Sequence, residues 1–183
     1  MHYCAFVRGL PEEHIHRRYH DFQYGFPVEN DNEIFGRLIL EINQAGLSWT
    51  TILNKQEHFR SAYAGFEISR IAVFTEKDVA RLMTDAGIVR NRLKIAAAIY
   101  NAGRVMDLQK KHGSFLNWLC LHHPADISTW TAVFRKTFRF TGGEIVNEFL
   151  MSLGFLPGAH GADCPVYEKT RMAGALHFQT LPG

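Results

Sequence analysis

The chain has 183 residues, of which 46% are apolar and 21% charged, and its formal net charge is +2. A chain of this length and composition can bury a core without disulfides, which excludes an intrinsically disordered protein and an acidic tail protein. The charge permits nucleic-acid binding without indicating it. No apolar run is long enough to span a bilayer, and the first residues lack the pattern of a signal peptide, so we expect a cytoplasmic protein.

Helical periodicity dominates the chain. We expect an irregular segment over residues 1–29, then helices, then an irregular segment over residues 157–183. The predicted helices begin near Asn30, Ser48, Thr75, Asn91, Ser114 and Thr141, the fourth running to about Lys111. Gly87 and Gly154 are predicted to end two helices, Leu93 to face the core, and Cys120 to be a buried thiol. Alternating strand patterns and internal repeats are absent, so the sequence predicts an all-α fold in a single domain, residues 1–183.

The segment 85–94 joins two predicted helices through Gly87 and carries Arg90, Arg92 and Lys94. A glycine turn before a helix N-terminus presents backbone amides to an anion. One interpretation is a helix–hairpin–helix that grips a DNA phosphate through these amides. The other is an ordinary helical hairpin with a solvated basic face, and the pattern alone leaves both open.

His160 and Cys164 form an H-x3-C pair near one end of the chain, and Cys4 and His20 lie near the other. Together they make a Cys₂His₂ set, the closed tetrahedral kind that holds structural zinc. The spacing alone does not establish a metal site, because ten histidines produce such pairs by chance.

Glu41 falls inside the apolar stripe of its predicted helix, shortly before Trp49. A carboxylate at an inward position needs a partner. It either bonds a neighbouring helix cap or an arginine, or it forms the floor of a pocket with Trp49 as an aromatic wall.

Four segments, read with Cys4 and the H-x3-C pair, resemble the DNA-3-methyladenine glycosylase I family in the same order along residues 3–167. The most specific is the run Gln44-Ala45-Gly46-Leu47-Ser48-Trp49, which follows Glu41. The others are Tyr19-His20-Asp21-x-x-Tyr24-Gly25-x-Pro27, Asp85-Ala86-Gly87-Ile88-Val89-Arg90-Asn91-Arg92-Leu93-Lys94-Ile95, and Phe138-x-Phe140-x-Gly142.

The resemblance implies an all-α helix–hairpin–helix glycosylase that repairs alkylated double-stranded DNA, and we expect it to act as a monomer without a membrane. It implies that a structural zinc ion joins the termini through Cys4, His20, His160 and Cys164. Because 3-methyladenine in DNA is cationic, the base leaves neutral, and the enzyme must chiefly flip the lesion and hold it beside water. Glu41 is the candidate catalytic residue.

The resemblance also implies the contacts with DNA. The base pocket is expected to consist of Glu41, which bonds the base edge, Trp49, which stacks on it, and Phe6, His16 and Tyr19. The duplex is expected to contact Gln44, Gly46 and Leu47, with Leu47 plugging the gap, and a phosphate to contact Gly87, Ile88 and Val89. The sequence has no lysine between Gly87 and Asn91, which predicts a monofunctional glycosylase that does not cut the strand.

Two pocket positions depart from the family, because Phe6 replaces its usual tryptophan and His16 its usual tyrosine. A phenylalanine stacks less well on a cation, and a protonated histidine would repel one. The alternative function is therefore a divergent paralogue that binds DNA or a modified base without excising it, or that has altered specificity. A zinc hydrolase acting on a small molecule is a third reading, which a set of four protein ligands disfavours.

Overall fold

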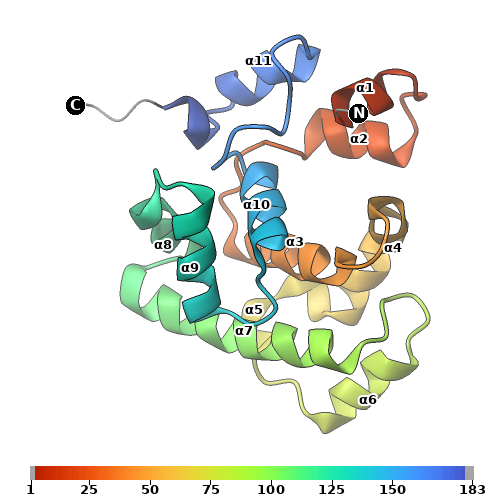
Figure 1. Ribbon diagram of the computed structural model, residues 1–183. Coiled ribbons are helices and arrows are strands. Elements are labelled where there is room, and N and C mark those ends of the chain that lie inside the picture. Colours follow the sequence, from red (N-terminus) through yellow and green to blue (C-terminus); the bar gives the residue numbers. More distant parts are fainter. Residues whose placement is uncertain (1–2, 180–183) are drawn as a thin grey trace. The chain divides into compact units, whose positions relative to one another are not determined.

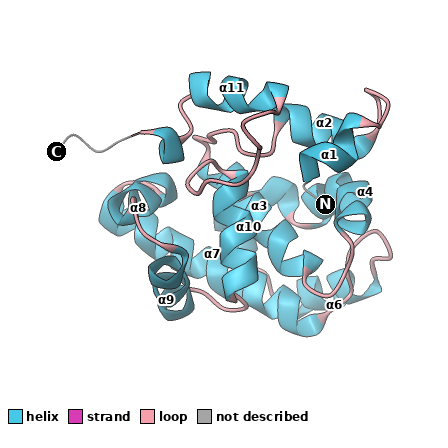
Figure 2. Cartoon of the chain, turned by 45° about the horizontal axis from the view of Figure 1, so that its top comes forward, coloured by secondary structure: helices cyan, strands magenta, loops and turns pink. Residues whose placement is uncertain are grey.

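Every regular element that the computed structural model describes, over residues 3–179, is helical, which confirms the predicted all-α class. Figure 2 shows the helices connected by loops, with no strand among the described residues. The chain divides into two compact units, Glu29–Val146, and Met1–Val28 together with Asn147–Gly183. The single domain predicted from the sequence stays a prediction. No described helix is long and apolar enough to cross a membrane.

The unit Glu29–Val146 is organised around its longest helix, α7, against which α3, α5, α6 and α8 pack (Figure 1). Its elements are α3 (Asp31–Gln44), α4 (Trp49–Ala62), η1 (Ala64–Phe66), α5 (Ile68–Ile71), α6 (Glu76–Thr84), α7 (Arg92–His112), α8 (Phe115–His122) and α9 (Ile127–Thr137). Helix α10 (Gly143–Ser152) begins in this unit and continues into the other.

Side-chain caps explain why these helices begin where they do. The side chains of Asn30, Ser48, Asn91 and Ser114 each accept a hydrogen bond from a backbone amide in the first turn of the helix that follows. Thr75 and Asp78 form the predicted capping box of α6. The sequence therefore predicts the starts of α3, α4, α6, α7 and α8 correctly.

Asp31 ties the beginning of α3 to the corner between α7 and α8. Its carboxylate accepts hydrogen bonds from the amides of Phe115 and Leu116, at 2.7 and 3.0 Å, and from the Gln109 side chain at 2.7 Å. The carboxylate thereby satisfies two of the amides that the first turn of α8 leaves without helical partners. This corner adjoins an aromatic core in which the rings of Phe115, Trp118, Phe134 and Phe138 meet in stacked, tilted and edge-to-face pairs.

The prediction that the two terminal segments are irregular is wrong, because both contain helices. They hold α1 (Tyr3–Arg8), α2 (Ile15–Phe22), α11 (Pro165–Met172) and η2 (Leu176–Phe178), while residues 1–2 and 180–183 lie outside the described residues. Each of these helices has at most eight residues. So short a helix gives too few turns for a periodic pattern, and it depends on tertiary contacts for its stability.

Two further predictions about single positions need correction, and one helix was not predicted. Leu93 is 69% exposed and its neighbour Lys94 is buried instead. Cys120 is exposed, because α8 turns Trp118 and Leu119 inward. Helix α9 was not predicted, since its threonines and valine are weak helix formers, and burial of Trp130 and Phe134 holds it in place. Gly154, at φ +76°, ends α10 as predicted.

Candidate metal centre and base-recognition elements

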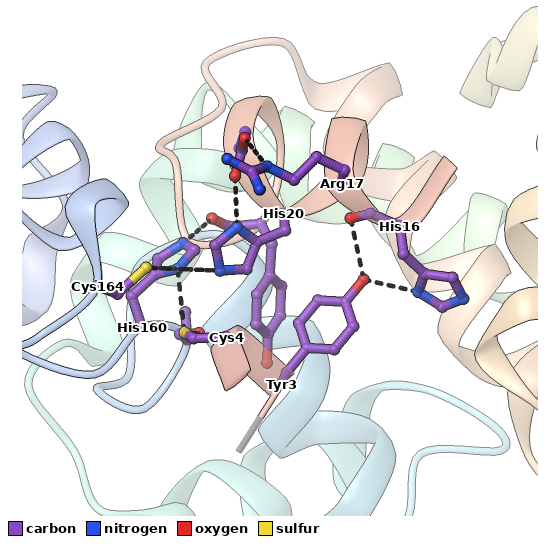
Figure 3. A network of polar contacts seen from close by, with 10 residues as sticks. Tyr3, Cys4, His16, Arg17, His20, His160 and Cys164 are labelled. Carbon is purple, nitrogen blue, oxygen red and sulfur yellow. Dashed lines mark hydrogen bonds and ion pairs between the residues drawn. The ribbon is translucent and has the colours of Figure 1, made fainter. Parts of the chain in front are cut away.

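Cys4, His20, His160 and Cys164 meet in one buried group within the unit formed by the two chain ends (Figure 3). Helix α1 carries Cys4 and α2 carries His20. His160 lies in the loop before α11, and Cys164 caps that helix. One ligand atom from each residue lies within 4.8 Å of all the others. The structure therefore brings together all four residues of the predicted metal site into a group that could hold an ion.

The imidazole rings are oriented by hydrogen bonds on their outer nitrogens. His20 Nδ1 lies 2.6 Å from an oxygen of Asp21, and His160 Nε2 lies 2.7 Å from the carbonyl oxygen of Tyr24. This leaves His20 Nε2 and His160 Nδ1 facing each other at 3.2 Å. Such outer partners fix the tautomer and the direction of a ligating histidine. Sequence reasoning gave neither Asp21 nor Tyr24 this role.

Asp21 stays ionised beside His20. Burial by itself would raise the pKa of the Asp21 carboxyl, but hydrogen bonds from His20 and from Arg17, whose Nε lies 2.6 Å away, lower it below the usual range. A carboxylate here increases the basicity of the imidazole to which it is bonded. Arg17 thus supports the site indirectly, through Asp21 (Figure 3).

Aromatic side chains gather beside this group, in the same unit. The Phe6 and His16 rings meet edge to face at 5.3 Å between centroids, and Tyr19 lies 5.5 Å from Tyr24. His16 Nδ1 hydrogen bonds with the Tyr3 hydroxyl at 2.9 Å. His16 and Tyr19 are buried and Phe6 is 45% exposed. The three residues predicted for the base pocket from this part of the chain therefore belong to one aromatic cluster.

Burial lowers the pKa of His16, and the neighbouring charge of His14 lowers it further. His16 is thus held neutral at pH 7, and a neutral imidazole does not repel a cationic base.

The other predicted pocket residues, Glu41 and Trp49, belong to the unit Glu29–Val146 and flank one turn. Glu41 lies in the last turn of α3 and is only 5% exposed, and Trp49 is the first residue of α4. Between them the Leu47 amide donates to the Gln44 carbonyl at 2.7 Å, and the Gln44 side chain donates to the Leu47 carbonyl at 2.9 Å. Gly46, at φ +83°, makes this turn possible.

Leu47 is 40% exposed at the tip of this turn. An apolar side chain on the outside of a tightly hydrogen-bonded turn is available to another molecule. The role of Leu47 as a wedge stays a prediction.

The 85–91 hairpin, between α6 and α7, is folded onto its own aspartate. The Gly87 amide donates to Asp85 Oδ1 at 2.7 Å. A Cβ at position 87 would lie 2.9 Å from the exposed His58 ring, which would have to shift to admit a larger residue. Ile88 is 3% exposed, so only its backbone could reach a ligand. Arg92 pairs with Glu76 at 2.6 Å.

Lys94 is the residue that sequence reasoning misjudged most. The sequence places it among the basic residues beside the hairpin. In the structure it is 5% exposed, and its Nζ donates to the carbonyls of Asn43 and Ala45, at 3.0 and 2.7 Å. It therefore contacts the end of α3 and not the solvent.

The sequence profile of the methyladenine glycosylase family matches residues 10–133. The chain is 31% identical to DNA-3-methyladenine glycosylase 1 of Escherichia coli K12, with 91% of this chain and 97% of that protein aligned. It is also 31% identical to the DNA-3-methyladenine glycosylase of Haemophilus influenzae, over 84% of this chain and 93% of that protein.

Solved structures of the same kind of enzyme have a similar fold. A Tyr-to-Phe variant of 3-methyladenine DNA glycosylase I in complex with 3-methyladenine superposes with a TM-score of 0.80, at 31% identity, covering 91% of this chain and 97% of that one. The Staphylococcus aureus enzyme gives 0.77, at 32% identity and with 89% and 95% covered. Fold and relatives together define an all-helical glycosylase. The chain belongs to the methyladenine glycosylase family, which confirms the resemblance seen in the sequence.

Proposed function

We propose that this chain excises 3-methyladenine from alkylated double-stranded DNA by hydrolysis of the N-glycosyl bond, without cutting the strand. The observation that carries the proposal is the match, over nine-tenths of the chain, to a glycosylase structure in complex with 3-methyladenine. The buried carboxylate of Glu41 and the aromatic ring of Trp49 support it. The resemblance assigns both residues to a pocket for a flat cationic base.

Hydrolysis of this N-glycosyl bond requires few catalytic groups from the protein. The lesion carries a positive charge on its base, so cleavage of the bond to the sugar releases a neutral base, and water supplies the oxygen that bonds to the sugar carbon. The enzyme needs no general acid for the leaving group. Glu41 would accept a hydrogen bond from the base edge and favour its cation, and Trp49 with Phe6, His16 and Tyr19 would supply aromatic faces.

The duplex contacts follow from the two loops of the unit Glu29–Val146. Leu47 would enter the gap left by the flipped nucleotide, with Gln44 and Gly46 beside it. The backbone of Gly87, Ile88 and Val89 would bind a phosphate, which would take the place of the Asp85 carboxylate on the Gly87 amide. In this way α6, the hairpin and α7 would act as a helix–hairpin–helix.

We further propose that the Cys4, His20, His160 and Cys164 group holds a structural zinc ion. A tetrahedron with Zn–S near 2.3 Å and Zn–N near 2.0 Å has edges of about 3.3 to 3.8 Å between donor atoms. The two histidine nitrogens here lie 3.2 Å apart, and three of the four sulfur–nitrogen pairs lie 3.6 to 3.8 Å apart. All four donor atoms lie within 4.8 Å of one another. Four protein ligands leave no position open for water, so zinc would fix the chain ends and take no part in the reaction.

Metal analysis of the purified protein tests this assignment. We expect one zinc per chain, loss of the zinc in Cys164→Ser, and retention of it in the matched control Cys120→Ser, because Cys120 is exposed and lies outside the group. Protein that binds zinc at one per chain in both variants would contradict the assignment.

Release of free 3-methyladenine from methylated duplex DNA tests the activity. We expect release by the wild type, and a rate lower by about 10- to 100-fold in Glu41→Gln, the loss expected for a hydrogen bond to a charged group. Trp49→Ala should be impaired as well. Glu57→Gln, an exposed carboxylate on α4, is the matched control and should keep the full rate.

Wild-type protein that is folded and zinc-loaded but releases no base would overturn the proposed activity. The replacement of the family's usual aromatic residues by Phe6 and His16 favours one second candidate in that event, a protein that binds a modified base without excising it. Binding to a panel of modified bases would then identify the ligand. The monomeric state and the cytoplasmic location stay predictions, and light scattering of the purified protein checks the first.

A further inference from the structure

Lys94 occupies a position that the pattern of its own helix does not explain. It lies in the first turn of α7, where a cation is disfavoured by the positive end of the helix dipole. Its neighbour Leu93 is 69% exposed while Lys94 is 5% exposed, so the helix buries the ammonium and leaves the leucine outside. The free-energy cost of burying a charge has to be offset by a specific partner.

That partner is the end of α3. The last carbonyls of a helix lack helical partners, and a cation beside them is favourable. The Asn43 carbonyl and the carbonyl of the capping residue Ala45 both accept from Lys94 Nζ, at 3.0 and 2.7 Å, and the Gln44 carbonyl between them accepts from the Leu47 amide. Lys94 therefore holds the first half of the turn whose tip is Leu47.

A second lysine makes a similar contact in the opposite direction. Lys55 lies on α4, the helix that follows the turn, and its Nζ donates to the carbonyl of Ala86 in the 85–91 hairpin at 2.7 Å. Lys94, which follows the hairpin, thus donates to the turn, and Lys55, which follows the turn, donates to the hairpin. The two loops that the proposed function places on DNA are braced against each other.

We propose that Lys94, assisted by Lys55, is a positioning residue for base extrusion: it sets the spacing between the Gln44–Leu47 turn and the 85–91 hairpin. The hairpin fixes the duplex by a phosphate, and the turn inserts Leu47 at a set distance from that phosphate. The inference rests on the proposed function. It also separates Lys94 from the phosphate-binding charges, because its ammonium is buried against carbonyls.

Lys94→Met tests the inference, since methionine keeps the long apolar stem and removes the donors. We expect excision from methylated duplex to slow by on the order of 10- to 100-fold, the loss expected when a reacting group is misplaced by about 1 Å. The Kd for free 3-methyladenine should change by less than about twofold, because the proposed base contacts Glu41 and Trp49 lie in α3 and α4 and not in the turn between them. The exposed Lys77→Met on α6 is the matched control and should change neither value.

The salt dependence of binding to undamaged duplex separates positioning from phosphate contact. Loss of one phosphate contact reduces the slope of log Kd against log salt by about one. Lys94→Met should keep the wild-type slope. A reduced slope, or a loss of free-base affinity that parallels the loss of excision, would overturn the assignment of Lys94 as a positioning residue for extrusion.

Lys55→Met keeps the inference testable if Lys94→Met fails to fold, because Lys55 is only partly buried and makes its contact near the surface. It should slow excision by a few-fold with the free-base Kd and the salt slope unchanged; an unchanged excision rate would then contradict the brace.

The fluorescence of 2-aminopurine in the duplex reports unstacking without any excision. If the wild type unstacks the base but releases none, the proposed activity fails and the positioning role is judged by loss of this signal in the variant. If neither variant loses the signal, the positioning role is wrong.

Discussion

His16 stands where the resemblance leads us to expect a tyrosine, and its surroundings counter this difference. Burial and the charge of His14 lower the pKa of His16, and the Tyr3 hydroxyl hydrogen bonds with its Nδ1. An imidazole kept neutral offers an aromatic face in place of the family's usual tyrosine. Protonation would add a positive charge beside a base that is already cationic.

We therefore expect acid to inactivate the protein through His16. Because the folded pKa lies below the ordinary value of about 6.5, His16 is neutral at pH 7 and takes up its proton only as the pH falls below that value. Base release should be constant near neutral pH and should decline in acid, and His16→Tyr should lack this decline.

The measurement is the initial rate of 3-methyladenine release between about pH 5 and 8, a range that brackets the ordinary pKa of histidine. Zinc content determined at each pH is the control. An acid decline of the same midpoint in His16→Tyr would assign the titration to another group.

At the scale of elements, a glycine in α3 shows how packing sets the sequence. Gly36 lies inside the helix, where glycine costs about 1 kcal/mol relative to alanine. The buried Phe66 ring fills the space beside it, and a Cβ at position 36 would lie 2.4 Å from that ring. The Phe66 backbone has the left-handed conformation, with φ +64°. Arg60 covers the ring from 5.0 Å and pairs with Glu33 on α3, so the ring cannot easily move.

Gly36→Ala is accordingly expected to lower the free energy of unfolding by about 1 to 3 kcal/mol, because overpacking outweighs the gain in helix propensity. Gly103→Ala on α7 is the matched control: nothing lies within 4 Å of its added methyl, and we expect a gain of about 0.5 to 1 kcal/mol. Urea denaturation measures both. Equal changes in the two variants would show that Phe66 does not constrain Gly36.

The same scale shows what the sequence could predict. Caps and periodicity together predict the starts of the longer helices, because both signals are local. They fail at Leu93 and Lys94, where the carbonyls at the end of a distant helix decide which side chain is buried. They fail also for α1, α2 and α11, which are too short for a periodic signal.

The candidate site divides in the same way. The ligand types of the metal group are predicted by resemblance, and the structure brings these four residues together. The partners that orient the rings, Asp21 and the Tyr24 carbonyl, lie in a segment that resembles the family, but the sequence does not show that they contact the two imidazoles. The pocket and phosphate contacts of Glu41, Trp49 and Gly87 stay predictions.

For the molecule as a whole, the proposed zinc ion is the device that joins the two chain ends. It would connect residues 4 and 20 with residues 160 and 164. The described apolar cluster at this place is small: Cys4, Cys164 and Val166, with Phe26 and Tyr167 packed against them. Helices of six to eight residues are unstable alone. A metal ion binds the folded arrangement far more tightly than the unfolded chain, so its binding free energy adds to the stability of this unit.

Removal of zinc by a chelator should therefore act unevenly along the chain. We expect amide hydrogen exchange to accelerate in α1, α2 and α11, because their stability depends on the ion, and to change little in α7, whose inward residues pack within the unit Glu29–Val146. Mass spectrometry of peptides from the protein with and without chelator measures both, and Cys120→Ser serves as the control that keeps the site. Equal acceleration in α7 would mean that the ion stabilises the whole chain as one cooperative body, and no acceleration in α2 would mean that the chain ends fold without it.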